Sequence, residues 1–196
     1  MEINSMSGRL SLLHRVAQAA AAAMVAAALV GCSPAYDWRS VPVEKARLSV
    51  SLPCKPDAGQ RSVEMGADRV DIAMVGCAAR GSLFALSYMT LKDPSQVAST
   101  LTLWHDAVRR QLQLPAVEPG KGPAEQPFLR KGALDVPQSI RMKEEAVGPD
   151  GRRLWVDAVW FARIDGTSVQ LVHAVMYAPT RDDRTADSFL GSIALQ

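Results

Sequence analysis

The segment 153–178 restricts the possible folds of this chain more than any other. Two runs rich in β-branched and aromatic residues, 153–164 and 167–178, are separated only by Asp165-Gly166. That dipeptide is typical of a two-residue turn between antiparallel strands. With such a turn Ile164 faces Thr167, which sets the register of a β-hairpin. One face then carries the predicted core residues Leu154, Val156, Ala158, Trp160, Ala162, Val169, Leu171, His173, Val175 and Tyr177.

The opposite face of this hairpin is more apolar than a fully solvated face should be. Its large apolar residues are Trp155, Val159, Phe161, Val172 and Met176. A contiguous exposed apolar patch marks an interaction site, so these five residues are a candidate partner face. Burial beneath a second layer of the same domain is the alternative interpretation.

Further strands are predicted on both sides of a central helix. Alternating or strongly β-forming segments occur at 48–52, 61–65, 70–74 and 82–91, and again at 140–147 just before the hairpin. Short polar or glycine-containing connections separate neighbouring segments within each group. The two groups therefore predict two antiparallel β-meanders.

The clearest helix begins near Asp93 and ends before Pro115. Asp93 predicts an N-cap, Pro94 suits the first turn, and Gln96 completes a capping box. Apolar residues then recur every three or four positions, which indicates a helix that packs on one face. This stripe consists of Val97, Leu101, Trp104, Val108 and Leu112. The charged residues Asp106, Arg109 and Arg110 are predicted to lie off the stripe.

Two further segments complete the domain. The proline- and glycine-rich segment 115–137 is unusually long for a structureless loop, so it either hides a short strand near Phe128 and Leu129 or is mobile and functional. At the end of the chain, a capping box predicts a short helix from Thr180 onward. That box consists of Thr180 and Asp183, and the helix carries Ala186, Phe189 and Leu190 on one side.

The predicted fold class is therefore α+β, with two antiparallel β-meanders forming a sheet, one long helix between them and a short C-terminal helix. This order of elements and the closing Phe189-Leu190-Gly191-Ser192-Ile193 resemble PsbP-like domains, small α+β modules. The resemblance spans the domain by element order and no specific motif carries it. It implies an accessory, non-catalytic role.

The first 31 residues are typical of an export signal. Arg9 and Arg15 precede an alanine-rich apolar run, 16–30, that only Gln18 interrupts. As a helix this run spans about 22 Å at about 1.5 Å per residue. A bilayer core needs about 30 Å, so a cleaved signal is favoured over a permanent transmembrane helix.

The signal ends in Leu29-Val30-Gly31-Cys32, which resembles the lipobox of bacterial lipoproteins. The resemblance implies cleavage before Cys32, a diacylglyceryl thioether on its sulfur and acylation of the freed amine; several acyl chains make such an anchor stable. Ser33, rather than aspartate, favours the outer membrane with the protein facing the periplasm. The expected organisation is a signal peptide (1–31), a lipidated tether (32–46) and a single α+β domain (47–196). A secretory signal without lipidation is the alternative.

Two cysteines remain once Cys32 is lipidated, Cys54 and Cys77. An even pair in an oxidising compartment favours a disulfide. In an up-down-up meander they would lie at the same edge of the sheet, although an intervening strand would hold them apart. Two buried free thiols are the alternative.

The composition offers little support for several kinds of chemistry. The chain has 22 basic and 20 acidic residues with no basic block, so nucleic acid is not an expected partner. After residue 32 the only histidines are His105 and His173, and neither has a neighbouring carboxylate at a metal-ligand spacing. No residue is proposed as catalytic, cofactor-binding or metal-binding, and no cofactor is expected.

These patterns lead to three hypotheses about function. The first is a non-enzymatic, periplasm-facing lipoprotein that binds another envelope protein. The second is a carrier of a small apolar ligand held between sheet and helix. The third, a hydrolase, would need a carboxylate such as Asp157 beside His173, but the hairpin register places these two residues on opposite faces.

Overall fold

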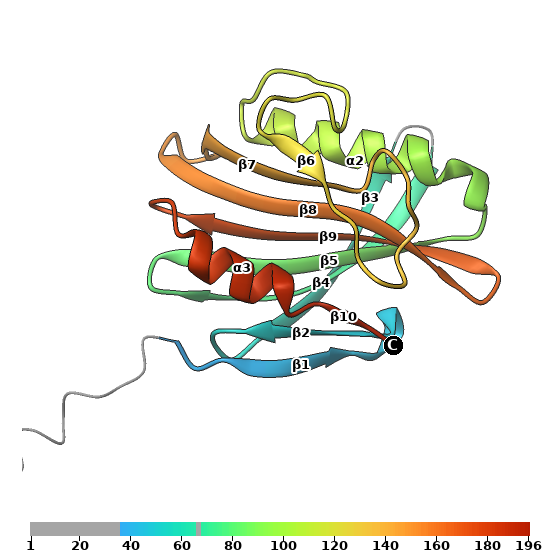
Figure 1. Cartoon of the computed structure of the whole chain (residues 1–196), viewed down its shortest axis with the longest axis horizontal. Helices are drawn as coiled ribbons and strands as arrows, with labels where there is room; N and C mark the ends of the chain where they lie inside the picture. Colours follow the sequence, from blue (N-terminus) through green and yellow to red (C-terminus); the bar gives the residue numbers. More distant parts are fainter. Residues whose placement is uncertain (1–35, 66–67) are drawn as a thin grey trace, which may run out of the picture. The chain divides into compact units, whose positions relative to one another are not determined.

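The computed structural model describes residues 36–65 and 68–196 (Figure 1). The predicted signal peptide and Cys32 lie outside these residues. Tyr36–Gln196 forms one compact unit of antiparallel sheets and helices. The α+β class is confirmed at this level, whereas the simple arrangement of two meanders in one sheet is wrong, because the strands divide between two sheets.

The larger sheet has seven strands, and the two predicted meanders join within it through β5 and β9. In spatial order its strands are β3 (Asp57–Met65), β4 (Asp68–Ala79), β5 (Ser82–Leu91), β9 (Ser168–Ala178), β8 (Arg153–Asp165), β7 (Ile140–Val147) and β6 (Glu125–Pro127). The predicted bounds of β5 and β7 are confirmed, whereas β3 and β4 extend well beyond the predicted segments. β3 therefore forms one edge of the sheet and the short β6 the other.

The smaller sheet corrects the predicted tether. It contains β1 (Arg39–Val43), β2 (Leu48–Leu52) and β10 (Ala194–Leu195), with the 3-10 turn η1 (Glu44–Ala46) between the first two. β2 pairs with β1 along its length and leaves the first meander. The domain thus begins before residue 47, because β1 belongs to it. Its partner β2 is the strand that alternation alone assigned to the first meander.

The central hairpin has the predicted faces but a different register. Asp165 pairs with Ser168 and Ile164 pairs with Val169, so the turn residues are Gly166 and Thr167. Gly166 adopts a φ of 61°, which glycine tolerates at no steric cost. The register differs from the predicted one by two residues, and an even shift leaves every side chain on its predicted face.

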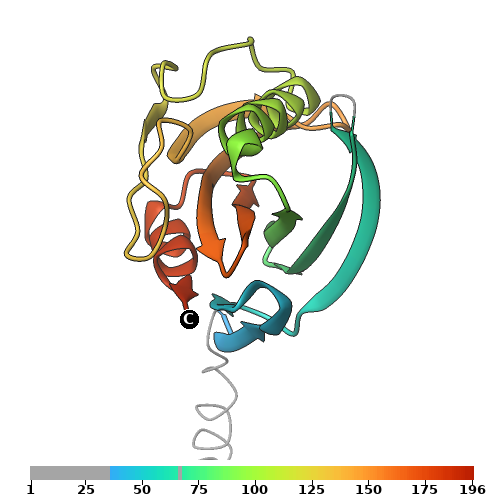
Figure 2. The same cartoon turned by 90° about the vertical axis from the view of Figure 1, so that its right-hand side faces the viewer.

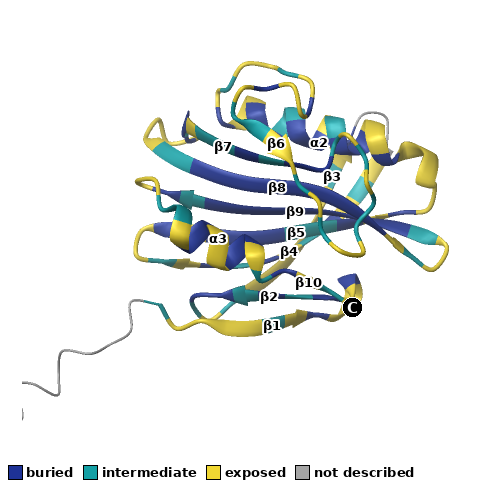
Figure 3. Ribbon diagram, in the orientation of Figure 1, coloured by how far each residue is buried: buried dark blue, intermediate teal, exposed yellow. Residues whose placement is uncertain are grey.

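Both faces of the large sheet are covered, which produces two cores. Helix α2 (Val97–Gln111) packs on one face, while α3 (Asp183–Gly191) and the small sheet pack on the other (Figure 2). β8 and β9 lie in the middle and are buried along most of their lengths, whereas β1 is largely exposed (Figure 3). The seven-stranded sheet is thus the central layer of a three-layer domain.

The helix ends depend on different caps from those predicted. Asp93 accepts a hydrogen bond from the Ser95 N–H, but it caps the 3-10 turn η2 (Pro94–Gln96) that precedes α2, and the side chain of Gln96 forms no cap. Asp182, rather than Thr180, caps α3 by accepting from the Thr185 N–H. Within the described ranges, no helix combines the length and hydropathy needed to cross a bilayer.

The segment 115–137 contains the predicted short strand, slightly earlier in the chain than expected. β6 ends at Pro127, and the N–H of the next residue, Phe128, donates to the Ser139 carbonyl at 2.8 Å. Pairing with β7 holds β6 against the sheet. The segment therefore closes one edge of the sheet.

The predicted disulfide between Cys54 and Cys77 is present, with Cα atoms 5.9 Å apart. Its structural setting differs from the predicted meander. The chain leaves β2, turns at Cys54 and enters β3 at Asp57, which pairs with Gly76 directly beside Cys77. The bridge therefore ties the small sheet to the large one. Closing a loop of 23 residues stabilises the fold by about 3 kcal/mol in the chain-entropy model.

Candidate functional site

The predicted partner face is wrong, because a second layer covers it. Val159, Phe161, Val172 and Met176 are each 0% exposed. They form a core with residues of α3 and of the small sheet. Trp155 alone stays partly exposed, with the Arg181 guanidinium 5.1 Å from the centre of its ring. The alternative of ordinary second-layer packing is therefore confirmed for those four residues.

A separate cleft lies along β3, β4 and β5. It has a volume of about 610 Å³, and its remaining walls come from η1, η2 and the first turn of α2. A second cleft of about 470 Å³ lies between β1 and the start of β3. The two clefts share Lys45, Gln60, Ala73 and Tyr88, so they are adjoining parts of one depression. We call this depression the β3 groove.

The lining of the β3 groove combines exposed charged side chains with apolar surface. Lys45, Arg69 and Lys92 are exposed there, and within residues 36–65 and 68–196 none of them has an acidic partner at ion-pair distance. The two acids of the larger cleft are already engaged, because Asp71 accepts a hydrogen bond from the Ser62 hydroxyl and Asp93 caps η2. The groove therefore offers uncommitted cations to a partner.

Neutral groups of the groove add hydrogen-bonding capacity beside apolar surface. Burial raises the pKa of Tyr88, so its phenol stays protonated at neutral pH and can donate a hydrogen bond. Gln60 and Thr90 are exposed in the same lining, while Met89 and Leu91 are buried beneath it. This combination suits a partner that has both polar and apolar groups.

Sequence reasoning missed the β3 groove because its walls come from segments far apart in the chain. Lys45 belongs to the predicted tether, and Gln60 precedes the predicted start of its strand. The residues that line the groove have no fixed spacing in the sequence, so they form no detectable motif. One feature of the sequence that could have indicated the groove is the length of the polar hairpin that β3 and β4 form.

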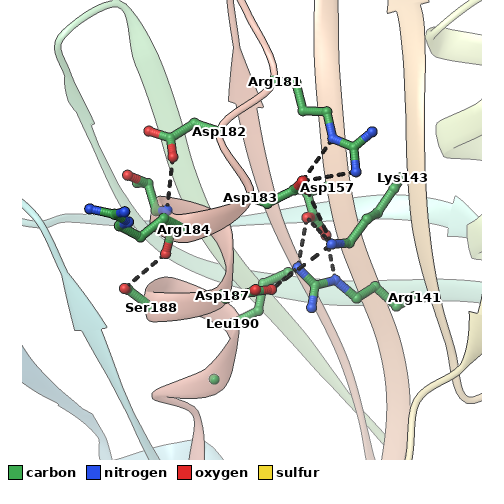
Figure 4. Close-up of polar contacts among 12 residues, drawn as sticks. Arg141, Lys143, Asp157, Arg181, Asp182, Asp183, Arg184, Asp187, Ser188 and Leu190 are labelled. Atoms are coloured by element: carbon green, nitrogen blue, oxygen red, sulfur yellow. Dashed lines mark hydrogen bonds and ion pairs between the residues drawn. The ribbon is translucent and has the colours of Figure 1, made fainter.

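A cluster of ion pairs joins α3 to the sheet on the opposite side (Figure 4). Asp157 on β8 is completely buried and accepts two hydrogen bonds from Arg141 on β7, each 2.7 Å long. Arg141 also donates to Asp187 at 2.6 Å. Lys143 lies between Asp157, at 3.7 Å, and Asp183, at 3.2 Å. Every charge in this cluster has a partner, so its role is to hold α3 on the sheet.

Arg141 is the central cation of this cluster. Burial lowers the pKa of Arg141, but hydrogen bonds and charges from Asp157 and Asp187 outweigh burial and raise the pKa overall. The guanidinium therefore stays charged. Arg141 connects Asp157 of the sheet with Asp187 of α3, two residues that are 30 positions apart in the sequence.

A second buried polar network contains Arg109, for which the sequence predicted only a position off the apolar stripe of α2. This residue is buried, and its Nη1 lies 3.1 Å from Glu125 and 3.2 Å from Glu144. His105 Nε2 also lies 2.8 Å from Glu125 Oε1. The face of α2 that carries Arg109 is thus covered by β6, whose Glu125 supplies the opposite charge.

Glu125 connects this network to the turn before β6. Burial raises the pKa of Glu125. Hydrogen bonds from His105 and from the Gly120 N–H, together with the charge of Arg109, outweigh burial and hold the pKa below its ordinary value. Gly120 has a φ of 81°, which glycine tolerates at no steric cost. Glu125 therefore remains ionised and fixes the segment 115–127 to α2.

His173 lies in the core beneath α2, and no carboxylate of residues 36–65 and 68–196 forms a hydrogen bond or an ion pair with it. Its ring stacks on Trp160 at 4.5 Å and meets the edge of Trp104 at 5.5 Å. Burial and the charge of His105 lower the pKa of His173 from 6.5 to about 3. Asp157 lies on the other face of the sheet, as the register predicted. The two residues that a hydrolase would need together are therefore apart.

The comparisons with known proteins add no family assignment. No protein-family model matches this chain, and no curated protein sequence matches it. The site is therefore interpreted from its own geometry.

Proposed function

We propose that this protein is a non-enzymatic lipoprotein of the bacterial envelope, anchored through Cys32 and facing the periplasm, that binds a protein partner in the β3 groove. The observation that carries the proposal is the larger cleft of the groove, with a volume of about 610 Å³ and three uncommitted cations. The lipobox-like Leu29-Val30-Gly31-Cys32 supports the anchor. The PsbP-like order of elements supports an accessory role.

The chemistry of the groove favours a protein segment with carboxylate side chains. Carboxylates would pair with Lys45, Arg69 and Lys92, and charge-assisted hydrogen bonds of this kind give both affinity and orientation. Apolar side chains of the same segment would contact the surface around Tyr88. A polypeptide supplies such a mixture of groups, as protein interfaces usually do.

A carrier of a small apolar ligand remains the second candidate. The volume of the larger cleft, about 610 Å³, lies within the usual range for ligand sites, about 300–1,000 Å³. Sites of that kind are lined mostly by apolar side chains, however, and here five exposed charged residues line the larger cleft: Lys45, Arg69, Asp71, Lys92 and Asp93. The charged lining therefore favours a protein partner.

Photocrosslinking in intact cells tests the proposed binding. We expect a photoreactive amino acid at Thr90, which lines the groove, to give a discrete product between the full-length lipidated chain and a different protein. The Lys45→Glu substitution should weaken this product about tenfold, because it replaces an attractive charge with a repulsive one. The products would be separated by mass and identified by peptide sequencing.

The matched control for this experiment is Lys121→Glu, an exposed lysine outside the groove lining. It should leave the product unchanged. Equal loss in both variants would indicate a general effect of net charge and would contradict a site in the groove. A Thr90 product that contains only a bound lipid would favour the carrier.

A separate prediction concerns the anchor. We expect Cys32→Ala to move the protein from the membrane fraction to the soluble fraction, because the substitution removes the sulfur that would carry the acyl chains. A Cys54→Ala/Cys77→Ala double variant should stay in the membrane, since it removes only the disulfide. Cell fractionation followed by immunoblotting measures both. Retention of Cys32→Ala in the membrane would contradict the lipoprotein assignment.

A further inference from the structure

β3 is an edge strand whose outer side is unpaired. It pairs with β4 over nine residues, from Asp57 to Met65, and no other strand of the described chain pairs with it. The side chains from Asp57 to Ser62 are exposed on both faces of the sheet. A long, exposed edge presents a row of unpaired backbone N–H and C=O groups and readily accepts another strand.

Gly59 stands in the middle of the exposed part of β3, and the fold itself does not require a glycine there. Its φ is not in the left-handed region, and a Cβ at this position would meet nothing within 4 Å. A glycine within a strand often marks a place where another backbone approaches closely. Here that backbone would have to come from outside the domain described above.

The charges on either side of Gly59 are self-complementary. Asp57 and Arg61 lie two positions before and after Gly59, so all three share one face of the strand. Neither charged residue has an ion-pair partner among residues 36–65 and 68–196. In an antiparallel pair of two β3 strands centred on Gly59, Asp57 of each copy faces Arg61 of the other.

The same pairing would cover an exposed apolar side chain. Met74 on β4 pairs with Gly59 and is 48% exposed. If two β3 strands paired about Gly59, four residues would lie in one row across four neighbouring strands. In order they would be Met74 and Gly59 of one copy, then Gly59 and Met74 of the other. Strands lie about 4.8 Å apart, and the bare glycines leave room for both methionines to lean toward each other.

We propose that the chain forms a homodimer in which the β3 strands of two copies pair antiparallel about Gly59. The second copy satisfies the unpaired backbone groups of the edge. Two Asp57–Arg61 pairs set the register, and the two Met74 side chains meet over the glycines. Both copies contribute the same surface, as a two-fold symmetric interface requires.

Disulfide trapping of the full-length lipidated protein in intact cells tests this pairing. Facing residues of antiparallel strands have Cα atoms about 4.5–5.5 Å apart, which lies within the range of a disulfide. A Gly59→Cys variant should therefore form a covalent dimer of twice the chain mass on non-reducing gels. Ser99→Cys, on the exposed surface of α2, is the matched control and should remain largely monomeric.

Two charge reversals in the Gly59→Cys background test the register. Asp57→Arg places two arginines opposite each other, and Arg61→Asp places two aspartates opposite each other. Each variant expressed alone should lose the trapped dimer by about tenfold, because like charges directly opposite are destabilising. Co-expression of both, with two different epitope tags, should restore a mixed dimer, since both facing pairs are then attractive.

Three results would overturn the proposal. The first is equal trapping at Gly59→Cys and Ser99→Cys, which would show random collision. The second is failure of the two charge-reversed variants to form a mixed dimer. The third is a trapped product with another protein in place of the second copy. The first two results leave the Thr90 product of the larger cleft untouched, so the two proposals fail separately. The third would overturn the homodimer and support a protein partner in the β3 groove, because Gly59 lines the second cleft.

Discussion

An Asp157→Ala variant should lose about 3–5 kcal/mol of unfolding free energy, which is a large fraction of the stability of a domain this size. The substitution removes both hydrogen bonds that Asp157 accepts from Arg141. It leaves the Arg141 guanidinium in a largely buried place with only the exposed Asp187 as a partner. Urea denaturation followed by circular dichroism measures the loss.

Two further variants separate this buried pair from the rest of the ionic cluster. Asp187→Ala removes the exposed partner of the same arginine and should cost no more than about 1 kcal/mol. Combining Asp157→Ala with Arg141→Met should cost less than the sum of the two single substitutions, because neither buried charge then remains alone. Equal losses for Asp157→Ala and Asp187→Ala would contradict the assigned difference in burial.

Acidification should destabilise the protein through His173. The pKa of His173 is about 3 in the folded protein, against 6.5 ordinarily, so the unfolded chain binds a proton in a pH range where the folded protein does not. The stability that His173 contributes is therefore present above pH 6.5 and is lost as the pH falls toward 3. The loss should be about 2 kcal/mol between pH 7 and pH 5, and about 4 kcal/mol between pH 7 and pH 3.

A His173→Phe variant should remove most of this pH dependence, since phenylalanine keeps an aromatic ring against Trp160 but does not titrate. Glu125 also has a lowered pKa, but it acts in a lower range: its contribution is present above about pH 4.5 and is lost as the pH falls further. Chemical denaturation of both proteins at pH 7, 6 and 5 therefore isolates His173. An unchanged slope in His173→Phe would contradict the prediction.

Local patterns predicted most of the individual elements. The apolar stripe of α2 and the bounds of β5 and β7 follow from side-chain periodicity, and the stripe residues Leu101 and Trp104 are buried as expected. The faces of β8 and β9 were also predicted, although their register was displaced by two residues. Faces depend only on alternation along each strand, whereas register depends on which residues form the turn.

The candidate site could not be predicted in the same way. The sequence placed Arg109 only off the apolar stripe of its helix, but Glu125, 16 positions later, pairs with it in a buried network. Lys45 looked like part of a flexible tether, yet η1 places it in the wall of the β3 groove. Such contacts join segments that are far apart in the chain, so no spacing in the sequence reports them.

The sequence by itself determined most of the strands, both longer helices and the hairpin faces of the domain, because each depends on periodicity or turn chemistry within a few residues. It also contains the Leu29–Cys32 motif on which the anchor proposal rests. Only the tertiary structure decided that α3 and the small sheet cover Phe161 and Met176, and that β3 remains an open edge beside a groove. Whether an apolar face is exposed depends on what folds back over it, which is a matter of long-range packing.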